Sequence, residues 1–283
     1  VVETGDLCHI PPVVLKPDLD TVITIKLAVH VELQPQTLFR VITQRQGHAI
    51  VDKLARVHAV AALALGIAGL GSAFSARAIL SREINANYIR TNPAAVIIRS
   101  DVPAEKIGEL MSGSLVSNIE LRKAVRGRYM RGDNDWIPVY LYSVNDFSAV
   151  NIDRIYPDGG GWPVADGEIL IERAALSMVG EIEGGELTVC VPGAAPKSLR
   201  FSGRAWQPGL PPAWMEGVIF GYVTGKTLSD LGYTGNEAEL HIELSSKGDR
   251  ETNSRAAAVI REKISSMGYS VYDVTVPVPG RHP

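Results

Sequence analysis

The chain has 283 residues, of which 46% are hydrophobic and 21% charged, and its formal net charge is −3 at pH 7. This balance excludes the strongly basic surface of a nucleic-acid-binding protein, so we expect no nucleic-acid partner. The length allows one large domain or two small ones. The two cysteines, Cys8 and Cys190, are too few for a disulfide framework. We expect Cys190, which lies in a strand-like segment, to be a packed or half-exposed free thiol.

The longest uncharged stretch is VHAVAALALGIAGLGSAF at residues 57–74, between Arg56 and Arg77. A helix of this length is about 27 Å long, which is close to the thickness of a bilayer's hydrocarbon core. The pattern favours a transmembrane helix. Two alternatives stay open: a buried core helix, which is also apolar on all sides, and a signal peptide, whose apolar region is shorter and nearer the N-terminus.

Residues 1–56 form an unassigned N-terminal segment. Apolar and polar residues alternate between positions 23 and 33, which predicts a strand. Residues 37–56 are compatible with a helix that runs into the apolar stretch. The cysteine and histidines of this segment do not have the spacing of a metal site.

The helical pattern continues past the apolar stretch, without Pro or Gly, to about Tyr88. Asn92 precedes Pro93, and a residue before proline is pushed out of the helical region, so the helix should stop there. We therefore expect one helix from about Arg56, with a transmembrane part and a stalk that together cover residues 57–90.

After residue 91 the pattern alternates between helix and strand. Two helices are predicted, one at 103–111 capped by Asp101 and one at 250–267 capped by Asp249 and ended by Gly268. Residues 158–161 are predicted as a loop, and residues 168–223 as short strands with Gly and Pro turns. Longer strands are predicted at 95–99, 116–130, 137–142, 240–244 and 272–276.

The predicted fold class is α+β. The elements follow the order βαββ, then a β-rich insertion, then βαβ, and the two flanking parts would complete one sheet of ferredoxin-like type. We expect a two-lobed domain over residues 91–280. Residues 91–145 and 238–280 would form a split α+β lobe with both helices on one face, and residues 146–237 a β-rich inserted lobe.

No motif predicts catalysis. The stretch from Gly221 to Thr227 is one residue short of a phosphate-binding loop, and a short helix capped by Thr224 explains it more simply. The glycines at 159–161 are not followed by the helix that such a loop needs. The sequence has no nucleophile elbow and no metal-ligand spacing. We expect no catalytic, cofactor-binding or metal-binding residue, and no cofactor.

Several polar and aromatic side chains have a simpler structural interpretation. His241 shares the polar face of a strand with Glu239 and Glu243, which indicates a solvated sheet face. Carboxylate pairs need a cleft to act in catalysis, and the pattern predicts none around them. Tryptophans at strand ends and in loops more often pack or anchor turns than bind ligands. These carboxylates and tryptophans are Glu168 and Glu172, Glu181 and Glu183, Trp136, Trp162, Trp206 and Trp214.

Several collinear stretches resemble the FtsX/MacB-like permease family of ABC transporters. They are the apolar helix at 57–74, REINANYIRTNPAAVIIRSD at 82–101, WIPVYLYSVNDFSAVNIDRIYPDGGGWP at 136–163, EILIERAAL at 168–176, GVIFGYVTGKTLSDLG at 217–232 and VPVPGRHP at 276–283. The resemblance implies a first transmembrane helix, an extracytoplasmic MacB-like core domain of two lobes, and further membrane helices. Because the sequence begins with Val and stops at Pro283, we expect it to be a fragment.

The resemblance also implies a function. It implies a permease subunit in the bacterial cytoplasmic (inner) membrane, with the domain after residue 90 outside the cytoplasm. The implied partners are a separate ABC ATPase subunit, a second permease subunit in a homo- or heterodimer, and membrane lipid. ATP-driven helix motion would reach the outer domain by mechanotransmission, so that a substrate is exported or extracted. We expect the chain itself not to be an enzyme. The alternatives are a membrane-anchored extracytoplasmic binding or sensor module and a membrane-tethered hydrolase.

Overall fold

The computed structural model describes residues 46–132, 135–180, 182 and 185–282. The strand predicted at 23–33 and the helix predicted over 37–45 lie outside these residues. The first described element is α1 (Gln46–Arg90), a continuous helix of 45 residues that begins earlier than the predicted start at Arg56.

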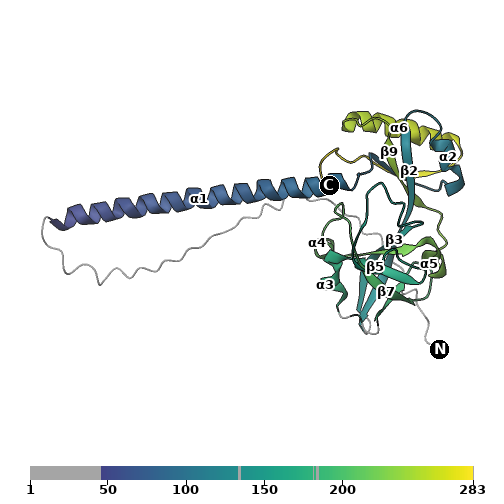
Figure 1. The fold of residues 1–283 in the computed structure, drawn as a ribbon, viewed down its shortest axis with the longest axis horizontal. Coiled ribbons are helices and arrows are strands. Elements are labelled where there is room, and N and C mark those ends of the chain that lie inside the picture. Colours follow the sequence, from purple (N-terminus) through teal and green to yellow (C-terminus); the bar gives the residue numbers. More distant parts are fainter. Residues whose placement is uncertain (1–45, 133–134, 181, 183–184, 283) are drawn as a thin grey trace. The chain divides into compact units, whose positions relative to one another are not determined.

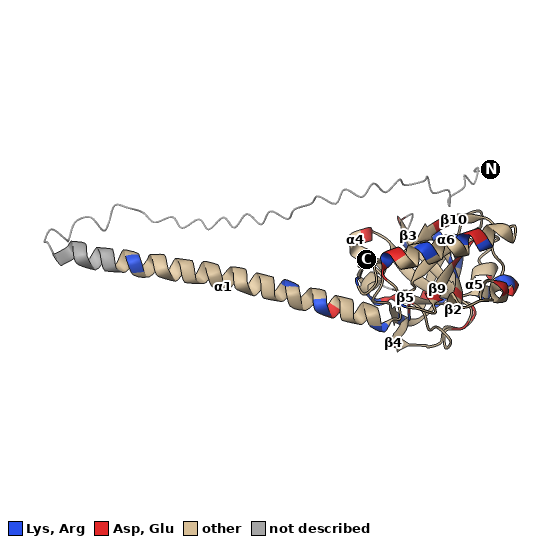
Figure 2. Ribbon diagram, turned by 90° about the horizontal axis from the view of Figure 1, so that it is seen from above, with Lys and Arg blue, Asp and Glu red and all other residues tan. Residues whose placement is uncertain are grey.

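One part of α1, within residues 54–90, is long and apolar enough to cross a membrane. Figure 2 shows a long uncharged stretch with basic residues on both sides of it. Its large apolar side chains are exposed, for example Leu65 at 73% and Phe74 at 69%. A core helix of a soluble domain would bury such side chains, so their exposure favours the membrane-spanning interpretation.

The end of α1 is fixed by local chemistry, as predicted. The hydroxyl of Thr91 donates a hydrogen bond to Tyr88 O at 2.7 Å. Asn92 follows with a positive φ of 54°, and its N–H donates to Ile89 O at 3.2 Å. Asparagine tolerates this left-handed conformation, which ends helices, and Pro93 cannot continue the helix.

The remaining elements form a sheet-rich domain with short helices (Figure 1). The helical elements are η1 (Ala104–Lys106), α2 (Ile107–Leu110), η2 (Arg173–Ala175), α3 (Leu176–Val179), α4 (Ala213–Glu216), α5 (Gly225–Asp230) and α6 (Arg250–Ser266). The strands are β1 (Val96–Ser100), β2 (Val116–Gly132), β3 (Asp135–Val144), β4 (Tyr156–Gly160), β5 (Glu168–Glu172), β6 (Glu186–Cys190), β7 (Lys197–Trp206), β8 (Ile219–Thr224), β9 (Ala238–Leu244) and β10 (Val271–Thr275).

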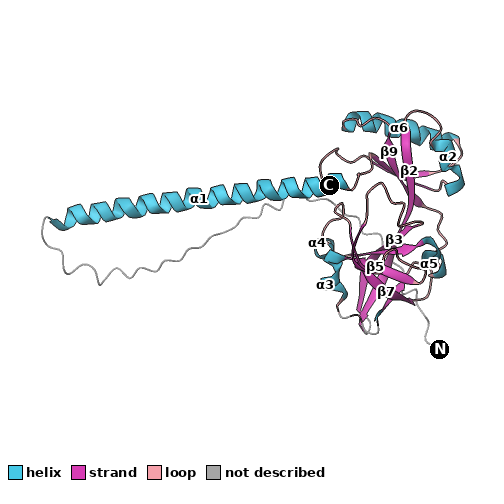
Figure 3. Ribbon diagram, in the orientation of Figure 1, coloured by secondary structure: helices cyan, strands magenta, loops and turns pink. Residues whose placement is uncertain are grey.

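The strands follow the order β10-β1-β9-β2-β3-β8-β5-β7-β4, and β6 pairs with β2 and β7. The 17-residue strand β2 connects two lobes, because it pairs with β9 as far as Arg122 and with β3 from Lys123 onward. We call first lobe the part made of β10, β1, β9, the start of β2, α2 and α6. The second lobe contains the rest of β2, β3 to β8 and the short helices α3, α4 and α5 (Figure 3).

The first lobe joins segments that are far apart in the sequence. Val96 in β1 pairs with Ile242 in β9, and Ile98 pairs with Val274 in β10. Helices α2 and α6 pack on one core that includes Leu110, Leu240 and Ile264. This agrees with the prediction that both helices cover the same face. The mixed α+β class with a split first lobe is as predicted.

The second lobe has its own core, with Val139, Leu141 and Ile219 fully buried. These side chains place β3 in the second lobe, whereas the boundary predicted at residue 145 grouped this strand with the first. The reason is that β2 changes partner in its middle, so β3 continues the sheet on the far side. The limits of 57–90 for the spanning helix and stalk and 91–280 for the domain stay predictions.

Two of the three predicted helix caps are confirmed and one is wrong. Asp249 caps α6 by accepting from Thr252 N at 2.8 Å, and Gly268 follows the helix with φ 88°. Thr224 caps α5 through Thr227 N, also as predicted. Asp101 does not cap the helix at 104–110. Instead its carboxylate accepts from Ser270 N at 2.7 Å and so ties β1 to the turn before β10.

Two other expectations are wrong. Residues 158–160, predicted as loop, belong to β4, because Gly160 and Gly203 let the backbones of β4 and β7 approach very closely. A Cβ built on Gly203 would lie 2.5 Å from Gly159 O. Cys190 is disulfide-bonded rather than a free thiol.

Candidate functional site

The carboxyl end of α1 is hydrogen-bonded to a loop at residues 151–156, and we call this region the junction. Asp153 N donates to Asn92 O at 3.0 Å, and Arg154 N donates to Thr91 O at 2.8 Å. The hydroxyl of Tyr156 donates to Arg90 O at 3.0 Å. The carbonyls at the end of a helix have no partner within it, so the loop satisfies groups that would otherwise need water.

A buried ion pair holds this loop against the first lobe. His241 Nδ1 lies 2.6 Å from Asp153 Oδ2, and His241 Nε2 lies 3.3 Å from Glu239 Oε2. The other oxygen of Asp153 accepts from Ala94 N at 3.3 Å. A single carboxylate therefore contacts both β9 and the start of the segment that leads from α1 into β1.

Arg122 joins the same network from β2, at the residue where this strand changes from one lobe to the other. Its guanidinium is 3% exposed and donates to Ile152 O, to Asp153 O at 3.3 Å and to Glu120 Oε2 at 3.1 Å. Glu120 Oε1 in turn accepts from Asn151 N at 2.6 Å and Ile152 N at 3.0 Å. Arg122 thus binds carbonyl groups of the loop and Glu120 binds its N–H groups, at the boundary between the lobes.

The electrostatics of this network favour the charged forms. Burial alone would lower the pKa of His241, but its hydrogen bonds to Asp153 and Glu239 outweigh burial and raise the pKa above its ordinary value. Burial alone would raise the pKa of Asp153, but the His241 and Arg122 charges hold it below its ordinary value. An imidazolium at His241 donates from both ring nitrogens and therefore matches both carboxylate contacts.

The junction also has an apolar side. Tyr88, 4% exposed, lies edge-on to His282 with ring centroids 5.4 Å apart. His282 N donates to Asn85 Oδ1 at 2.9 Å, and His282 Nε2 lies 2.8 Å from Pro208 O. A Cβ on Gly209 would lie 3.3 Å from the Tyr88 ring, so a glycine permits this close contact. The segment at 277–282 therefore returns to the last turns of α1.

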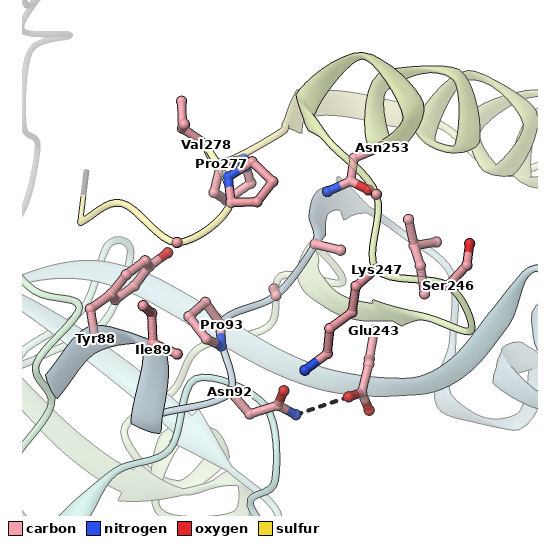
Figure 4. A pocket seen from close by; sticks show the side chains of 16 residues that line it. Tyr88, Ile89, Asn92, Pro93, Glu243, Ser246, Lys247, Asn253, Pro277 and Val278 are labelled. Carbon is pink, nitrogen blue, oxygen red and sulfur yellow. Dashed lines mark hydrogen bonds between the residues drawn. The ribbon is translucent and has the colours of Figure 1, made fainter. Parts of the chain in front are cut away.

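A pocket of about 290 Å³ opens at this side of the junction (Figure 4). Tyr88 and Ile89 line it from α1, Glu243 from β9, Asn253 from α6 and Val278 from the C-terminal segment. Asn92 Nδ2 donates to Glu243 Oε1 at 3.2 Å across one edge of the pocket. The pocket thus touches the end of α1, the first-lobe elements β9 and α6, and the C-terminal segment.

The structure changes the interpretation of His241. The sequence indicated a solvated face, but the side chain is buried, because the loop that carries Asp153 covers this part of β9. Asp153, Arg122 and Glu120 were not among the residues that the sequence pattern singled out. The pattern of β2 held no signal for Arg122, because this strand also carries Lys123, Arg126 and Arg128, which are only half-buried, and nothing in the sequence separates Arg122 from them.

The other residues considered in the sequence do not form a site in the described part of the chain. Glu168 pairs with Arg200, and Glu172 accepts from Ala174 N at 2.7 Å, so both carboxylates have structural partners. Burial raises the pKa of Glu172. Glu181 and Glu183 lie outside the described residues. No group of three or more His, Cys, Asp or Glu side chains within those residues has the arrangement of a metal site.

The tryptophans mostly pack, as expected. Trp162 lies edge-on to Phe147 at 5.4 Å, and Trp206 contacts Tyr156 and carries the Arg173 guanidinium 4.3 Å above its ring. Trp214 differs, because 66% of it is exposed.

Comparison with known proteins returns no matching family model and no matching curated protein. Among solved structures, the periplasmic region of MacB from Actinobacillus actinomycetemcomitans is similar, with 11% identity, a TM-score of 0.40, and coverage of 65% of this chain and 91% of that one. The extracellular domain of the noncanonic ABC-type transporter YknZ from Gram-positive bacteria has 13% identity and a TM-score of 0.40, covering 63% and 100%. A domain of a putative permease protein from Porphyromonas gingivalis has 10% identity and a TM-score of 0.34, covering 66% and 91%.

Proposed function

We propose that the chain is a permease subunit of an ABC transporter of the FtsX/MacB-like type. In this proposal residues 57–74 span the bacterial cytoplasmic membrane with their N-terminal side in the cytoplasm, and the domain after residue 90 is extracytoplasmic. The subunit pairs with a second permease subunit and contacts lipid. A separate ATPase subunit hydrolyses ATP, and the chain itself is not an enzyme. The sequence resemblance and the exposed apolar stretch of α1 support this assignment.

One observation carries the proposed mechanism: the backbone of α1 is continuous to Arg90, and the carbonyls of Arg90, Thr91 and Asn92 at its end accept hydrogen bonds from residues 153–156. Asp153 and Arg122 bind that loop to the first lobe and to the strand shared by both lobes. A shift or rotation of the helix would therefore pull on the loop and, through it, on the domain. Export or extraction of a substrate would follow from that movement.

The mechanism is tested by a proline in the last turns of α1. Ile84, 40% exposed, is a suitable position, because Ile84→Pro removes one helical hydrogen bond and costs about 3 kcal/mol locally, while Ile84→Ala keeps the helix. The full subunit is reconstituted with its ATPase partner, and hydrogen exchange of the peptide covering 151–156 is followed with and without ATP. The amides of Asp153 and Arg154 report directly on their bonds to Asn92 and Thr91.

We expect ATP to change the exchange of this peptide in the parent protein and in Ile84→Ala. In Ile84→Pro, ATP hydrolysis should continue while the exchange no longer responds to it. An unchanged response in the proline variant would show that α1 does not transmit the motion. The membrane-anchored binding or sensor module would then be the better account.

Membrane orientation is tested separately. A tag placed after residue 282 should be accessible only from outside the cytoplasm, and a tag before residue 46 only from inside. The opposite accessibility would contradict the proposed orientation even if α1 spans the membrane.

A further inference from the structure

A second cavity, of about 260 Å³, lies on the face of β2 opposite to Arg122, and we call it the lobe cavity. Arg122 and Lys123 are consecutive residues of this strand, so their side chains point to opposite faces of the sheet. Lys123 lines the cavity together with Leu121, and α5 contributes Gly225 and Leu228. The lobe cavity therefore lies where β2 passes from one lobe to the other.

Lys123 brings a positive charge to the lobe cavity. Its ammonium donates a hydrogen bond to Gly235 O at 3.0 Å and lies 5.6 Å from the centre of the Tyr233 ring. No carboxylate within the described residues forms an ion pair with this ammonium, and no described Asp or Glu lines the cavity. An ammonium has three N–H donors, so donors remain for a bound molecule.

Ser143 adds a buried hydroxyl next to this charge. It pairs directly with Lys123 across β2 and β3, so the two side chains are neighbours on one face of the sheet. Ser143 is 4% exposed and lines the lobe cavity, and its hydroxyl makes no hydrogen bond to any described residue. Since Oγ is not one of the fully enclosed atoms without a partner, it keeps access to the cavity. Buried polar groups nearly always have a partner, and a molecule in the cavity would supply one.

Gly225 leaves space beside this hydroxyl. A Cβ built on Gly225 would lie 3.6 Å from Ser143 Oγ and 3.1 Å from Asn145 Oδ1, and all three residues line the cavity. The φ of Gly225 is not in the left-handed region, so the backbone conformation does not require glycine here. The missing side chain instead keeps the surroundings of Ser143 and Asn145 open.

The lining limits the chemistry of a ligand. Lys123, Ser143 and Asn145 offer N–H and O–H donors, which suit the oxygens of an anion. Among the described residues that line the cavity, Lys123 alone is charged, so the site balances a single negative charge. A phosphate group carries about −1.5 to −2 at neutral pH and fits this balance less well than a carboxylate. Leu121 and Leu228 add apolar surface for a hydrocarbon part.

From this arrangement we infer that the lobe cavity binds a small organic monocarboxylate with a short apolar chain, its carboxylate on Lys123 and Ser143. The inference goes beyond the proposed permease function and does not depend on it, since it rests on the lining of the cavity alone. A bound molecule would contact Leu121 of the first lobe and Leu228 of the second, and would thereby link the two lobes.

The probe is isovalerate, which combines a carboxylate with a short branched chain. Isovaleramide has nearly the same shape and no charge, and it serves as the matched probe. The full chain is placed in lipid nanodiscs with ¹³C-labelled Leu methyl groups, and the shifts of Leu121 and Leu228 are followed during titration. We expect saturable shifts of both residues with isovalerate and binding at least tenfold weaker for isovaleramide. Inorganic phosphate should also bind more weakly than isovalerate.

Two variants test the polar contacts. Lys123→Met keeps most of the side-chain length and removes the charge, so isovalerate binding should weaken at least tenfold. Ser143→Ala removes only the hydroxyl and should weaken binding about tenfold, because the hydrogen bond to a charged group is lost. Lys247→Met, at an exposed position outside the lobe cavity, is the matched control and should bind like the parent chain.

A third variant tests the space beside Ser143. Gly225→Ala places a methyl group next to Ser143 and Asn145, and the exposed Asn145 side chain can move by the few tenths of an ångström that this needs. The fold should therefore be kept while isovalerate no longer shifts Leu121 and Leu228. Gly108→Ala, where a Cβ meets nothing within 4 Å, is the matched control and should bind like the parent chain.

Equal binding of isovalerate and isovaleramide would overturn the inference, as would equal binding of isovalerate to the parent chain and to Lys123→Met. The absence of any shift at Leu121 and Leu228 up to molar isovalerate would also overturn it. Tighter binding of phosphate would contradict the assignment to a monocarboxylate. If Lys123→Met does not fold, Ser143→Ala and Gly225→Ala decide the question. Tests of ATP response at residues 151–156 do not enter this result, so failure of the permease proposal would be seen separately.

Discussion

His241 Nδ1 and Asp153 Oδ2 lie 2.6 Å apart, although the two residues are separated by 88 positions in the sequence. The contact joins β9 to the loop that is hydrogen-bonded to the residues at the end of α1. Both groups are buried, and His241 pairs with Glu120, two residues before the last residue of β2 that pairs with β9. A buried ion pair adds little net stability, but it makes one arrangement of the connected segments much more favourable than others.

Removing one charge of this pair should be costly. Asp153→Asn leaves His241 and Arg122 buried with one carboxylate fewer, and we expect a loss of roughly 3 kcal/mol in the free energy of unfolding. Urea unfolding followed by tryptophan fluorescence measures it, since all four tryptophans lie after residue 135. Asp273→Asn, at an exposed position in β10, is the control and should change stability little. Equal stability of the two variants would mean that the pair has no structural role.

The same pair predicts a pH dependence with a definite sign. His241 has a raised pKa when folded, so its contribution is complete below the ordinary value of 6.5 and is lost as the pH rises through the folded value. Asp153 has a lowered pKa, so its contribution is complete above 3.8 and is lost as the pH falls through the folded value. The groups facing the pair are Glu239, Arg122 and, through Arg122, Glu120.

We therefore expect the stability difference between the parent chain and Asp153→Asn to be largest between about pH 4 and 6.5 and smaller at pH 9. Unfolding midpoints at pH 5, 7 and 9 measure this difference. A difference that grows steadily toward pH 9 would contradict an imidazolium at His241.

The close approach of β4 and β7 at Gly160 and Gly203 gives a third prediction. Gly203 has φ 151° and no room for a Cβ beside Gly159 O, so Gly203→Ala should destabilise the domain by roughly 2 kcal/mol. Gly108→Ala is the matched substitution in α2, where a Cβ meets nothing within 4 Å, and it should be neutral or slightly stabilising. Thermal unfolding of both variants checks the contrast. A tolerated alanine at 203 would mean that the two strands can separate without loss.

A piece covering residues 82–282 should fold by itself. Both cores begin after residue 95, and the polar and aromatic contacts of the junction start at Asn85. The piece should neither bind ATP nor turn over ester, peptide or phosphate substrates, since the sequence has no phosphate-binding loop or nucleophile elbow. Near-ultraviolet circular dichroism and ATP titration measure these properties. Cooperative folding with measurable ATP binding would contradict the sequence interpretation.

Local chemistry made much of the fold predictable. The stop at Asn92, the Thr224 and Asp249 caps and the alternation in β2 and β9 depend on residues close in sequence, and all were predicted. The junction was not predicted, because it depends on which loop, distant in the sequence, covers His241. The same holds for two relations between strands. These are the change of β2 from pairing with β9 to pairing with β3 after Arg122, and the close approach of β4 and β7 at their glycines. The residue pattern of one strand does not contain such relations.

The strand shared by the two lobes has a mechanical consequence. Its 17 residues span about 56 Å at the usual rise of a strand. Packed surfaces can slide past one another under load, whereas a strand carries tension through peptide bonds. A force that the loop at 151–156 exerts on Arg122 is therefore carried by the backbone of β2, which contributes to both hydrophobic cores. Such a domain should be displaced as one stiff body rather than open along the boundary between its lobes.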